Sequence, residues 1–373
     1  MGNIDILLSL IFTGETKNIT FWVKVNRYPK MSLLFLYTVA MLTGCKMIKE
    51  QQVDSIFKAY NGVNLPGAAV MVIKQGQPVL IKSYGMAHLE QNIHVTPQTN
   101  FRLASMTKQF TAMCIMILVE QGKLQFNSSV GEIFPDFPKY GKHITIAQLL
   151  QHTSGLVDYE DLVTDSLPYQ IKDVEILQLM MKQDSTYFEP GSDYRYSNTG
   201  YALLAMVVEK ISEHSFADFL KSSIFGPLGM QYTVAYEQGI SEVTHRAYGY
   251  TVFPDSILLT DQSVTSAVLG DGGIYSSIDD LYKWDQALYT DKLVAPKTLE
   301  LAYTPHLEIY GFGWRIDDFK GHRRIHHTGS TRGFRTVIQR FPQDQFTIII
   351  LTNRNDPDVA PLAEKLTDLY LVK

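Results

Sequence analysis

The chain has 373 residues, of which 45% are hydrophobic and 19% charged, with a formal net charge of −5. This composition excludes a chain that is disordered as a whole, because such chains combine low hydrophobicity with high net charge, and it gives no sign of a nucleic-acid-binding protein. Two cysteines, Cys45 and Cys114, are too few for a disulfide framework, so we expect one large domain, or two interleaved ones, around an ordinary hydrophobic core.

Residues 1–44 differ in composition from the rest of the chain. Their basic first part leads into an apolar run of eleven residues, Ser32 to Leu42, which is too short to cross a bilayer and suits a secretory signal peptide. Leu42-Thr43-Gly44-Cys45 then resembles a bacterial lipobox, in which the cysteine accepts the lipid. The resemblance implies cleavage before Cys45 and a mature chain, residues 45–373, that its lipid anchors in the bacterial cell envelope, on the periplasmic or outer face of a membrane.

Two alternatives stay open for this end of the chain. A buried hydrophobic helix with an incidental cysteine would give a similar pattern. Met31 is also a candidate for the true start, in which case residues 1–30 are an over-long gene prediction.

The first part of the mature chain carries helical and strand-like patterns. Residues 48–61 predict a polar amphipathic helix, and residues 65–84 contain two β-rich runs separated by Gln75-Gly76-Gln77, which predicts a hairpin. Residues 101–122 predict a helix that is apolar on nearly every face and is therefore buried.

The middle and the end of the chain differ in pattern. Residues 126–240 are mostly helical with loops between, whereas the chain from Tyr310 returns to strand-like runs before a last helix over residues 359–371. Both chain ends should therefore build one sheet, with antiparallel strands because the connections are short. The expected fold is α+β, with an antiparallel sheet flanked by helices and formed by about residues 46–125 and 245–373, and with a mostly helical region of about residues 126–244 inserted.

Ser105-Met106-Thr107-Lys108 places a serine and a lysine one turn apart at the start of the buried helix. A helix N-terminus favours negative charge on the serine oxygen, and a lysine among apolar neighbours can lose its proton and act as a base. The spacing alone is weak evidence, because Ser55 and Lys58 share it on a polar helix. Ser105 and Lys108 are candidates for a nucleophile and its base.

Tyr196-Ser197-Asn198 precedes a predicted helix. A phenol beside an ammonium group can relay a proton, and the asparagine amide can both donate to and accept from an amide of a substrate. Taken alone, the pattern is better explained by an asparagine helix cap next to a packing tyrosine.

His327-Thr328-Gly329-Ser330 lies on a predicted strand, where Gly329 would let a substrate backbone approach closely. The neighbouring pair His326 and His327 raises the possibility of a zinc site. We do not expect one, because adjacent side chains of a strand point to opposite faces and no further ligand motif accompanies the pair.

The three motifs together, in this order and spread over more than 200 residues, resemble those of the penicillin-recognising serine hydrolases: Ser-x-x-Lys, Tyr-x-Asn and Lys/His-Thr-Gly. Longer blocks such as FRLASMTKQFTA, ITIAQLLQHTSGL, GDGGIYSS and YGFGWR extend the resemblance over about residues 65–355. It is closest to class C β-lactamases and to the D-Ala-D-Ala carboxypeptidases and esterases grouped with them. The resemblance implies a β-lactamase/transpeptidase-like fold, an acyl-enzyme mechanism, and no metal or organic cofactor.

The resemblance also implies a role for each motif residue. Ser105 would be the acylating nucleophile, while Lys108 and Tyr196 would share general-base and general-acid duty, with their order left open. The substrate would be held by Asn198, His327, Thr328 and Gly329, and the backbone N–H groups of Ser105 and Ser330 would form the oxyanion hole.

The implied reaction is cleavage of an amide or ester in a peptide-like or small substrate. A D-Ala-D-Ala carboxypeptidase or D-aminopeptidase, an esterase and a β-lactamase are all compatible with the motifs. The alternative from another class is a non-hydrolytic penicillin-binding or sensing lipoprotein with the same fold.

One position departs from the β-lactamase pattern, because His327 stands where these enzymes usually have a lysine that helps to anchor a carboxylate. Histidine is mostly neutral near pH 7, which weakens the case for efficient β-lactam turnover. Arg332 and Arg335 are either substitutes for the missing charge or solvated surface residues. We expect His152 to be structural, and the Gly270–Gly273 cluster to allow close packing of the backbone rather than to bind phosphate.

Overall fold

The computed structural model describes residues 5–10, 19–24 and 48–372. The chain divides into two units, Met1–Ile56 and Phe57–Lys373. The first contains a hairpin of β1 (Asp5–Leu10) and β2 (Ile19–Lys24), which the sequence did not predict, and a helix over residues 48–56. Cys45 and the apolar run before it lie outside the described residues, so cleavage and lipidation stay predictions. No helix of the described residues combines the length and apolarity needed to span a membrane.

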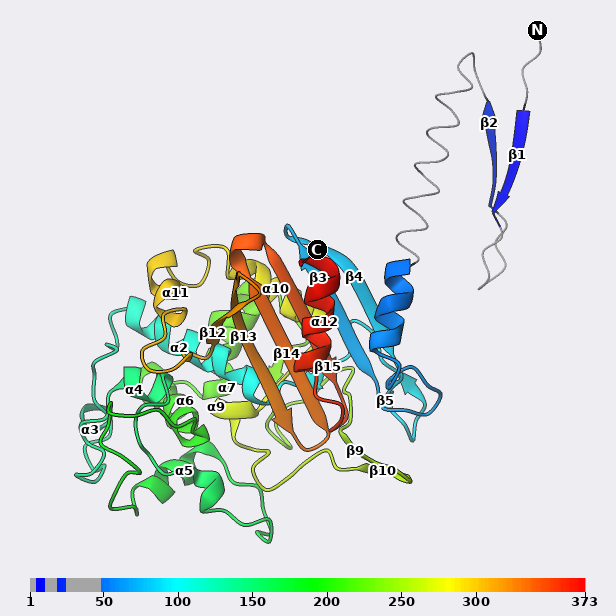
Figure 1. The fold of residues 1–373 in the computed structure, drawn as a ribbon. Coiled ribbons are helices and arrows are strands. Elements are labelled where there is room, and N and C mark those ends of the chain that lie inside the picture. Colours follow the sequence, from blue (N-terminus) through cyan, green and yellow to red (C-terminus); the bar gives the residue numbers. More distant parts are fainter. Residues whose placement is uncertain (1–4, 11–18, 25–47, 373) are drawn as a thin grey trace. The chain divides into compact units, whose positions relative to one another are not determined.

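The second unit is built on a six-stranded antiparallel sheet with the order β12-β13-β14-β15-β3-β4 (Figure 1). Strand β15 pairs with β3 and so joins the N-terminal and C-terminal parts of this unit, with Ile349 opposite Met71. This confirms the predicted α+β fold with an antiparallel sheet. The strands are β3 (Ala68–Lys74), β4 (Gln77–Tyr84), β12 (Arg315–Phe319), β13 (His322–Thr331), β14 (Phe334–Phe341) and β15 (Phe346–Thr352).

Helices cover the middle of this sheet. Helix α12 (Ala360–Tyr370) packs on β14 and β15, and α10 (Ile278–Ala287) packs on β15 and β3. Ala68 to Ile73 of β3 are all buried, as expected for a central strand. The predicted hairpin between β3 and β4 is present, and its turn residues Gln75 and Gly76 both have positive φ, as the tight turns of β-hairpins require.

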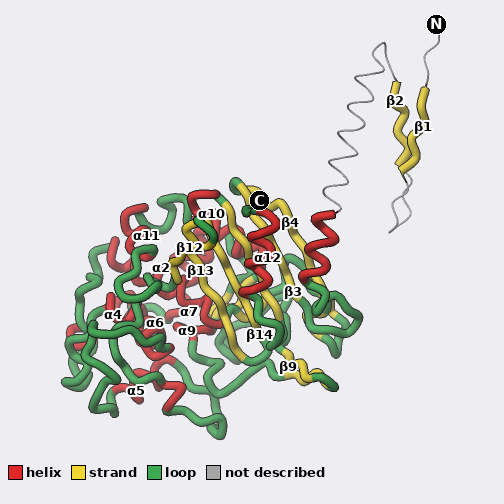
Figure 2. The backbone as a smooth tube through the Cα atoms, in the orientation of Figure 1, coloured by secondary structure: helices red, strands yellow, loops and turns green. Residues whose placement is uncertain are grey.

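Helices and long loops make up most of the chain between β4 and β12 (Figure 2). Helix α6 (Asn198–Ser212), which is apolar over most of its length, packs against α2 (Lys108–Glu120) and against α4, α5 and α9, and forms the centre of this region. The helices are α3 (Val130–Ile133), α4 (Ile146–Leu150), η2 (Tyr159–Asp161), α5 (Asp173–Met180), α6 (Asn198–Ser212), α7 (Phe216–Leu220), η3 (Lys221–Phe225), α8 (Gly226–Leu228), α9 (Leu269–Gly272) and α11 (Pro296–Ala302).

The remaining short elements connect these parts. A three-stranded sheet has the order β7-β11-β8, and β5-β6 and β9-β10 are separate two-stranded ribbons. These elements are β5 (Met86–His88), β6 (Ile93–His94), β7 (Phe101–Arg102), β8 (Val234–Ala235), β9 (Tyr250–Phe253), β10 (Ser256–Leu259), β11 (Ile274–Ser276) and η4 (Pro342–Asp344).

The predicted buried helix over residues 101–122 is divided into three elements. Strand β7 is followed by a 3-10 turn, η1 (Ala104–Thr107), and then by α2 (Lys108–Glu120), which is buried from Lys108 to Leu118. Ala104 has a φ of 50°, a left-handed conformation that ends the strand and is costly for a non-glycine residue. Ser105 therefore lies on a tight turn in front of the long helix and not within it.

Candidate active site

The three sequence motifs meet at one cleft of about 470 Å³. Ser105 comes from η1, Tyr196 and Asn198 from the start of α6, and the third motif from β13. Lys108 is fully buried at the start of α2, behind Ser105. The lining residues are Ser105, Asp158, Glu160, Asp161, Arg195, Tyr196, Asn198, Arg315, His327, Thr328 and Ser330.

Lys108 links the first two motifs. Its Nζ lies 3.2 Å from Ser105 Oγ, 2.7 Å from Asn198 Oδ1 and 3.0 Å from the carbonyl oxygen of Asp271. As an ammonium ion the side chain can donate to all three of these atoms, and as a neutral amine it can donate to Asn198 and Asp271 and accept from the Ser105 hydroxyl. The arrangement fixes Lys108 within hydrogen-bond distance of Ser105, the geometry needed for proton transfer between them.

Tyr196 completes the group around Lys108. The Lys108 Nζ lies 5.0 Å from the centre of the Tyr196 ring, within the range of a cation–π contact. The Tyr196 hydroxyl is buried and has no hydrogen-bond partner among the described residues. A buried unpaired hydroxyl costs about 1–3 kcal/mol, so this group is suited to bond with a substrate or a water molecule.

A hydrogen bond of its backbone N–H group positions Asn198, which is not the N-cap residue of α6 considered in the sequence analysis. Ser197 occupies the N-cap position of α6 without a side-chain bond, and the Asn198 N–H donates to Asp158 Oδ2 at 2.7 Å. The Asn198 side chain is therefore free to face the cleft and accept from Lys108.

His152 lies behind this segment. Its Nδ1 accepts from the Ser197 N–H at 3.1 Å, and its ring packs against that of Tyr196 at 4.2 Å. Burial, followed by the charge of Lys108, lowers the pKa of His152 well below its ordinary value, so the ring is neutral. This geometry agrees with the structural role expected from the sequence.

His327 is a buried, neutral residue. Its Nδ1 lies 2.6 Å from the carbonyl oxygen of Thr328, and its Nε2 lies 2.9 Å from the Tyr310 hydroxyl. Because a carbonyl can only accept, Nδ1 carries the proton and Nε2 accepts from Tyr310. Burial, followed by the charges of Lys108 and Arg315, lowers the pKa of His327 well below its ordinary value. His327 therefore supplies no positive charge for a carboxylate.

The two arginines suggested by the sequence do not supply that charge in the cleft either. Arg332 forms an ion pair with Asp165 at the surface. Arg335 donates from one guanidinium nitrogen to the carbonyl oxygens of Thr331 and Phe334. Neither arginine lines the cleft.

Arg315, which the sequence analysis did not single out, is the arginine placed there by β12. Its guanidinium lies 5.5 Å from the ring centres of both Tyr196 and Tyr310, and it forms no ion pair with any described residue. In the β12–β13 pairing Arg315 lies opposite His326, next to the third motif. Arg315 is the last residue of the block YGFGWR, which the sequence analysis had quoted as a family block. Its place beside the third motif follows only from the pairing of the two strands.

Gly329 has a packing role that the sequence analysis did not predict. A Cβ atom at this position would lie 2.0 Å from the carbonyl oxygen of Leu103 and 2.3 Å from Thr336 Oγ1. Thr336 Oγ1 itself donates to the Leu103 carbonyl at 2.7 Å. The glycine thus admits the chain's own backbone just before the Ser105 turn, while its contact with a substrate stays a prediction. It fixes β13 against η1.

An acidic segment forms the opposite wall of the cleft. Asp158 accepts from the backbone N–H groups of Glu160 and Asn198, and Asp161 pairs with Arg195 at 3.3 Å. Glu160 forms no ion pair with any described residue, although it is exposed to the cleft. Partial desolvation of its carboxyl by the walls of the cleft, followed by the charges of Asp271 and Asp158, raises the pKa of Glu160 to about 7. No sequence motif marked these acids.

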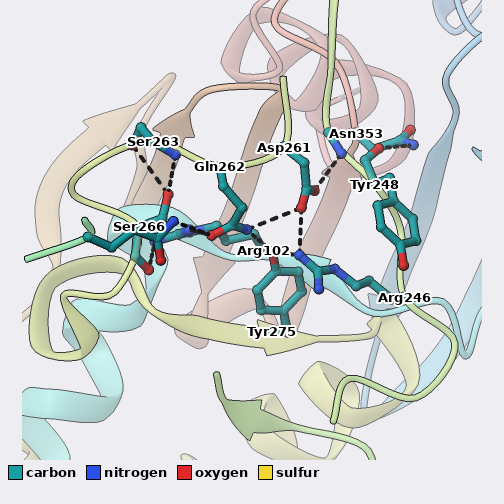
Figure 3. Close-up of polar contacts among 11 residues, drawn as sticks. Arg102, Arg246, Tyr248, Asp261, Gln262, Ser263, Ser266, Tyr275 and Asn353 are labelled. Carbon is teal, nitrogen blue, oxygen red and sulfur yellow. Dashed lines mark hydrogen bonds and ion pairs between the residues drawn. The ribbon is translucent and has the colours of Figure 1, made fainter. Parts of the chain in front are cut away.

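A polar network surrounds Arg102 on the strand that leads to Ser105 (Figure 3). Arg102, three residues before Ser105, is buried and donates to the carbonyl oxygens of Gly272 at 3.2 Å and Ser266 at 2.8 Å. The network continues from Arg102 through Gln262, Tyr275, Asp261 and Arg246.

The chain matches known proteins over nearly its whole length. The model of the Beta-lactamase family matches residues 53–371. A penicillin-binding protein of Bacillus subtilis (strain 168) is 34% identical over 333 residues, which cover 83% of this chain and 73% of that protein.

Solved structures agree with this assignment. The octameric penicillin-binding protein homologue from Pyrococcus abyssi superposes with a TM-score of 0.73 at 26% identity, covering 90% of this chain and 78% of that one. The D-amino acid amidase from Ochrobactrum anthropi SV3 superposes with a TM-score of 0.73 at 22% identity, over 86% of this chain and 97% of that one, and shares the fold. The chain belongs to the Beta-lactamase family of serine hydrolases and penicillin-binding proteins.

Proposed function

We propose that this protein is a serine hydrolase that forms an acyl-enzyme on Ser105 and cleaves an amide or ester of a peptide-like substrate. The observation that carries the proposal is the 3.2 Å contact between Lys108 Nζ and Ser105 Oγ at the cleft. A nucleophile within hydrogen-bond distance of its base, which a third group orients, is the geometry of covalent catalysis. Here Asn198 and the Asp271 carbonyl orient Lys108.

The reaction has two steps. In acylation the Ser105 O–H bond and the amide or ester bond of the substrate break, an ester forms between Ser105 Oγ and the substrate carbonyl carbon, and the proton moves through Lys108 and Tyr196 to the leaving nitrogen or oxygen. Water then cleaves the ester, which releases a carboxylic acid and restores the serine hydroxyl. The backbone N–H groups of Ser105 and Ser330 would stabilise the oxyanion in both steps.

The substrate class that the cleft favours is a peptide with a free terminal carboxylate, as in a D-Ala-D-Ala carboxypeptidase. Arg315 supports this choice, because its guanidinium lines the cleft without an ion pair among the described residues, and a guanidinium binds a carboxylate in two parallel hydrogen bonds. It would replace the cation that His327 does not provide.

Glu160 favours a second candidate, a D-aminopeptidase or an amidase acting on a substrate with a free amine. Its carboxyl lines the cleft close to Asn198 and has no cationic partner in an ion pair among the described residues. A substrate ammonium would provide one.

The first experiment is intact mass spectrometry of the full chain after incubation with benzylpenicillin, beside a Ser105→Ala control. We expect a covalent adduct, or hydrolysed antibiotic, with the wild type alone. An adduct that never turns over, with no hydrolysis of any D-alanyl peptide or ester, would favour the non-hydrolytic alternative. Acylation of the Ser105→Ala variant, or no reaction with β-lactam, peptide and ester alike, would contradict the proposal.

The carboxylate anchor is tested with acetylated D-Ala-D-Ala and its C-terminal amide. Arg315→Ala should raise KM for the acid about tenfold, equal to about 1.4 kcal/mol, and leave the amide nearly unchanged. Arg195→Ala is the matched control, because Arg195 lines the same cleft but is already paired with Asp161. Equal effects of Arg315→Ala on acid and amide would exclude this role.

A further inference from the structure

Helix α9 lies directly behind Lys108 and is held to the nucleophile segment by three successive carbonyl groups. The carbonyl oxygen of Gly270 accepts from Thr111 Oγ1 at 2.6 Å, that of Asp271 from Lys108 Nζ at 3.0 Å, and that of Gly272 from Arg102 Nε at 3.2 Å. All three donors are buried residues. The position of α9 therefore sets one of the three acceptors of the Lys108 ammonium.

Asp173 holds the other end of α9 from a different part of the fold. It is the first residue of α5, in the helical region, and its side chain is buried. Its Oδ2 accepts from the Leu269 N–H at 2.8 Å and its Oδ1 from the Gly270 N–H at 3.0 Å. Both oxygens of one carboxylate thus fix the backbone that precedes the three carbonyls.

Close packing prevents α9 from relaxing in the direction of α6. A Cβ atom on Gly270 would lie 2.3 Å from the Tyr201 carbonyl oxygen and 2.8 Å from the Ala205 Cβ. The helix is therefore placed by contact on one side and by Asp173 at its first two N–H groups. With four residues it has little stability of its own, so its position depends on these partners.

We propose that Asp173 is a positioning residue for catalysis, which acts through α9 to hold the Asp271 carbonyl against Lys108. The inference rests on the proposed function of Ser105 and Lys108. It assigns no contact with substrate to Asp173, which lies outside the cleft lining. Without the carboxylate, α9 shifts, the Lys108 ammonium loses an acceptor, and its approach to Ser105 Oγ loosens.

The test is the Asp173→Asn variant of the full chain, which keeps the size of the side chain but sets an NH₂ group against a backbone N–H. Burial raises the pKa of Asp173 to about 7, so the measurements are made at about pH 8, where the carboxylate is charged. We expect the first-order rate constant of acylation by benzylpenicillin or an ester to fall about 10- to 100-fold, as for a small displacement of a catalytic group, with the Kd of the substrate unchanged.

Three controls separate positioning from a general folding defect. Active-site titration gives the fraction of molecules that react, so that the rate constant refers to folded protein. Asp184→Asn, an exposed acid just beyond α5, should change nothing. Thr111→Val removes the bond to Gly270 from the other side of α9, and the double variant with Asp173→Asn should be non-additive, because both act on one element.

A crystal structure of the Asp173→Asn variant provides a readout that does not depend on activity. We expect a longer distance between Lys108 Nζ and the Asp271 carbonyl oxygen than in the wild type. If the wild type is inert towards every substrate, the proposed function fails, and this distance still decides the positioning role. An unchanged distance, or a wild-type acylation rate in the folded variant, would overturn the inference.

Discussion

The two walls of the cleft are built in different ways. On the sheet side, Lys108 is 0% and His327 1% exposed, and strand pairing and close backbone contacts fix the surrounding segments. On the opposite side, the acidic turn Asp158–Asp161 and Arg195 come from loops, and Glu160 is exposed to the cleft. The groups proposed for bond cleavage thus lie on the rigid wall, together with Arg315 of β12, whereas the acidic groups that would contact a substrate amine lie on the loop wall.

The ion pairs of the two regions show the same contrast. Arg340 Nε and Asp285 Oδ1 lie 2.6 Å apart beneath the sheet, with side chains that are 1% and 0% exposed. Arg195 and Asp161 lie 3.3 Å apart at the cleft, with side chains that are 50% and 57% exposed. The charges of a buried pair have no water to solvate them, so each needs hydrogen-bond partners within the protein. An exposed pair contributes little to the free energy of unfolding.

The largest effect is expected from Lys108→Met, which keeps an unbranched side chain one atom shorter but removes the amine that transfers the proton. Acylation of Ser105 should slow about 10³-fold, within the range for loss of a general base. Stopped-flow acylation, with circular dichroism to verify folding, measures this. A rate within a few-fold of the wild type would show that the rigid wall does not carry the chemistry.

The next effect concerns stability. Arg340→Met leaves the Asp285 carboxylate buried without a cationic partner, with Thr347 Oγ1 and Gln286 Nε2 as its side-chain donors, and should lower the free energy of unfolding by about 3–5 kcal/mol. Urea denaturation measures the change. The double variant Arg340→Met/Asp285→Leu should recover part of the loss, because it removes the unpaired charge; a double variant less stable than the single one would argue against this cause.

A smaller effect, in pH dependence, is expected at Glu160. Because the pKa of this carboxyl is raised to about 7, it is charged above that pH and becomes neutral below it. For a substrate with a free amine, kcat/KM should therefore fall severalfold as the pH drops through about 7, and Glu160→Gln should remove this limb of the profile. The acetylated substrate and the variant Asp161→Asn serve as controls. If kcat/KM of Glu160→Gln falls with pH in the same way as that of the wild type, the titrating group is not Glu160.

The smallest effect is expected from Arg195→Ala, which breaks the exposed pair with Asp161 and the stacking of the guanidinium on the Tyr187 ring. The free energy of unfolding should change by less than about 1 kcal/mol. Urea denaturation at low and high salt measures it, and a loss comparable to that of Arg340→Met would remove the contrast between the walls.

The family, the sheet formed by both chain ends and the three motifs that meet at the cleft could all be predicted from the sequence. These features depend on local patterns: hydrophobic periodicity defines strands and buried helices, and the motif residues keep their order and spacing. The neutral state expected for His327 also agrees with its buried bonds to Tyr310 and Thr328.

The charged groups that face the cleft could not be predicted from the sequence and became evident from the folded arrangement. Arg315 enters through the register of β12 beside β13, whereas Arg332 and Arg335 are engaged elsewhere. Gly329 packs against Leu103, more than 200 positions away in the chain. Such placements depend on contacts between segments far apart in sequence, and no local pattern encodes them.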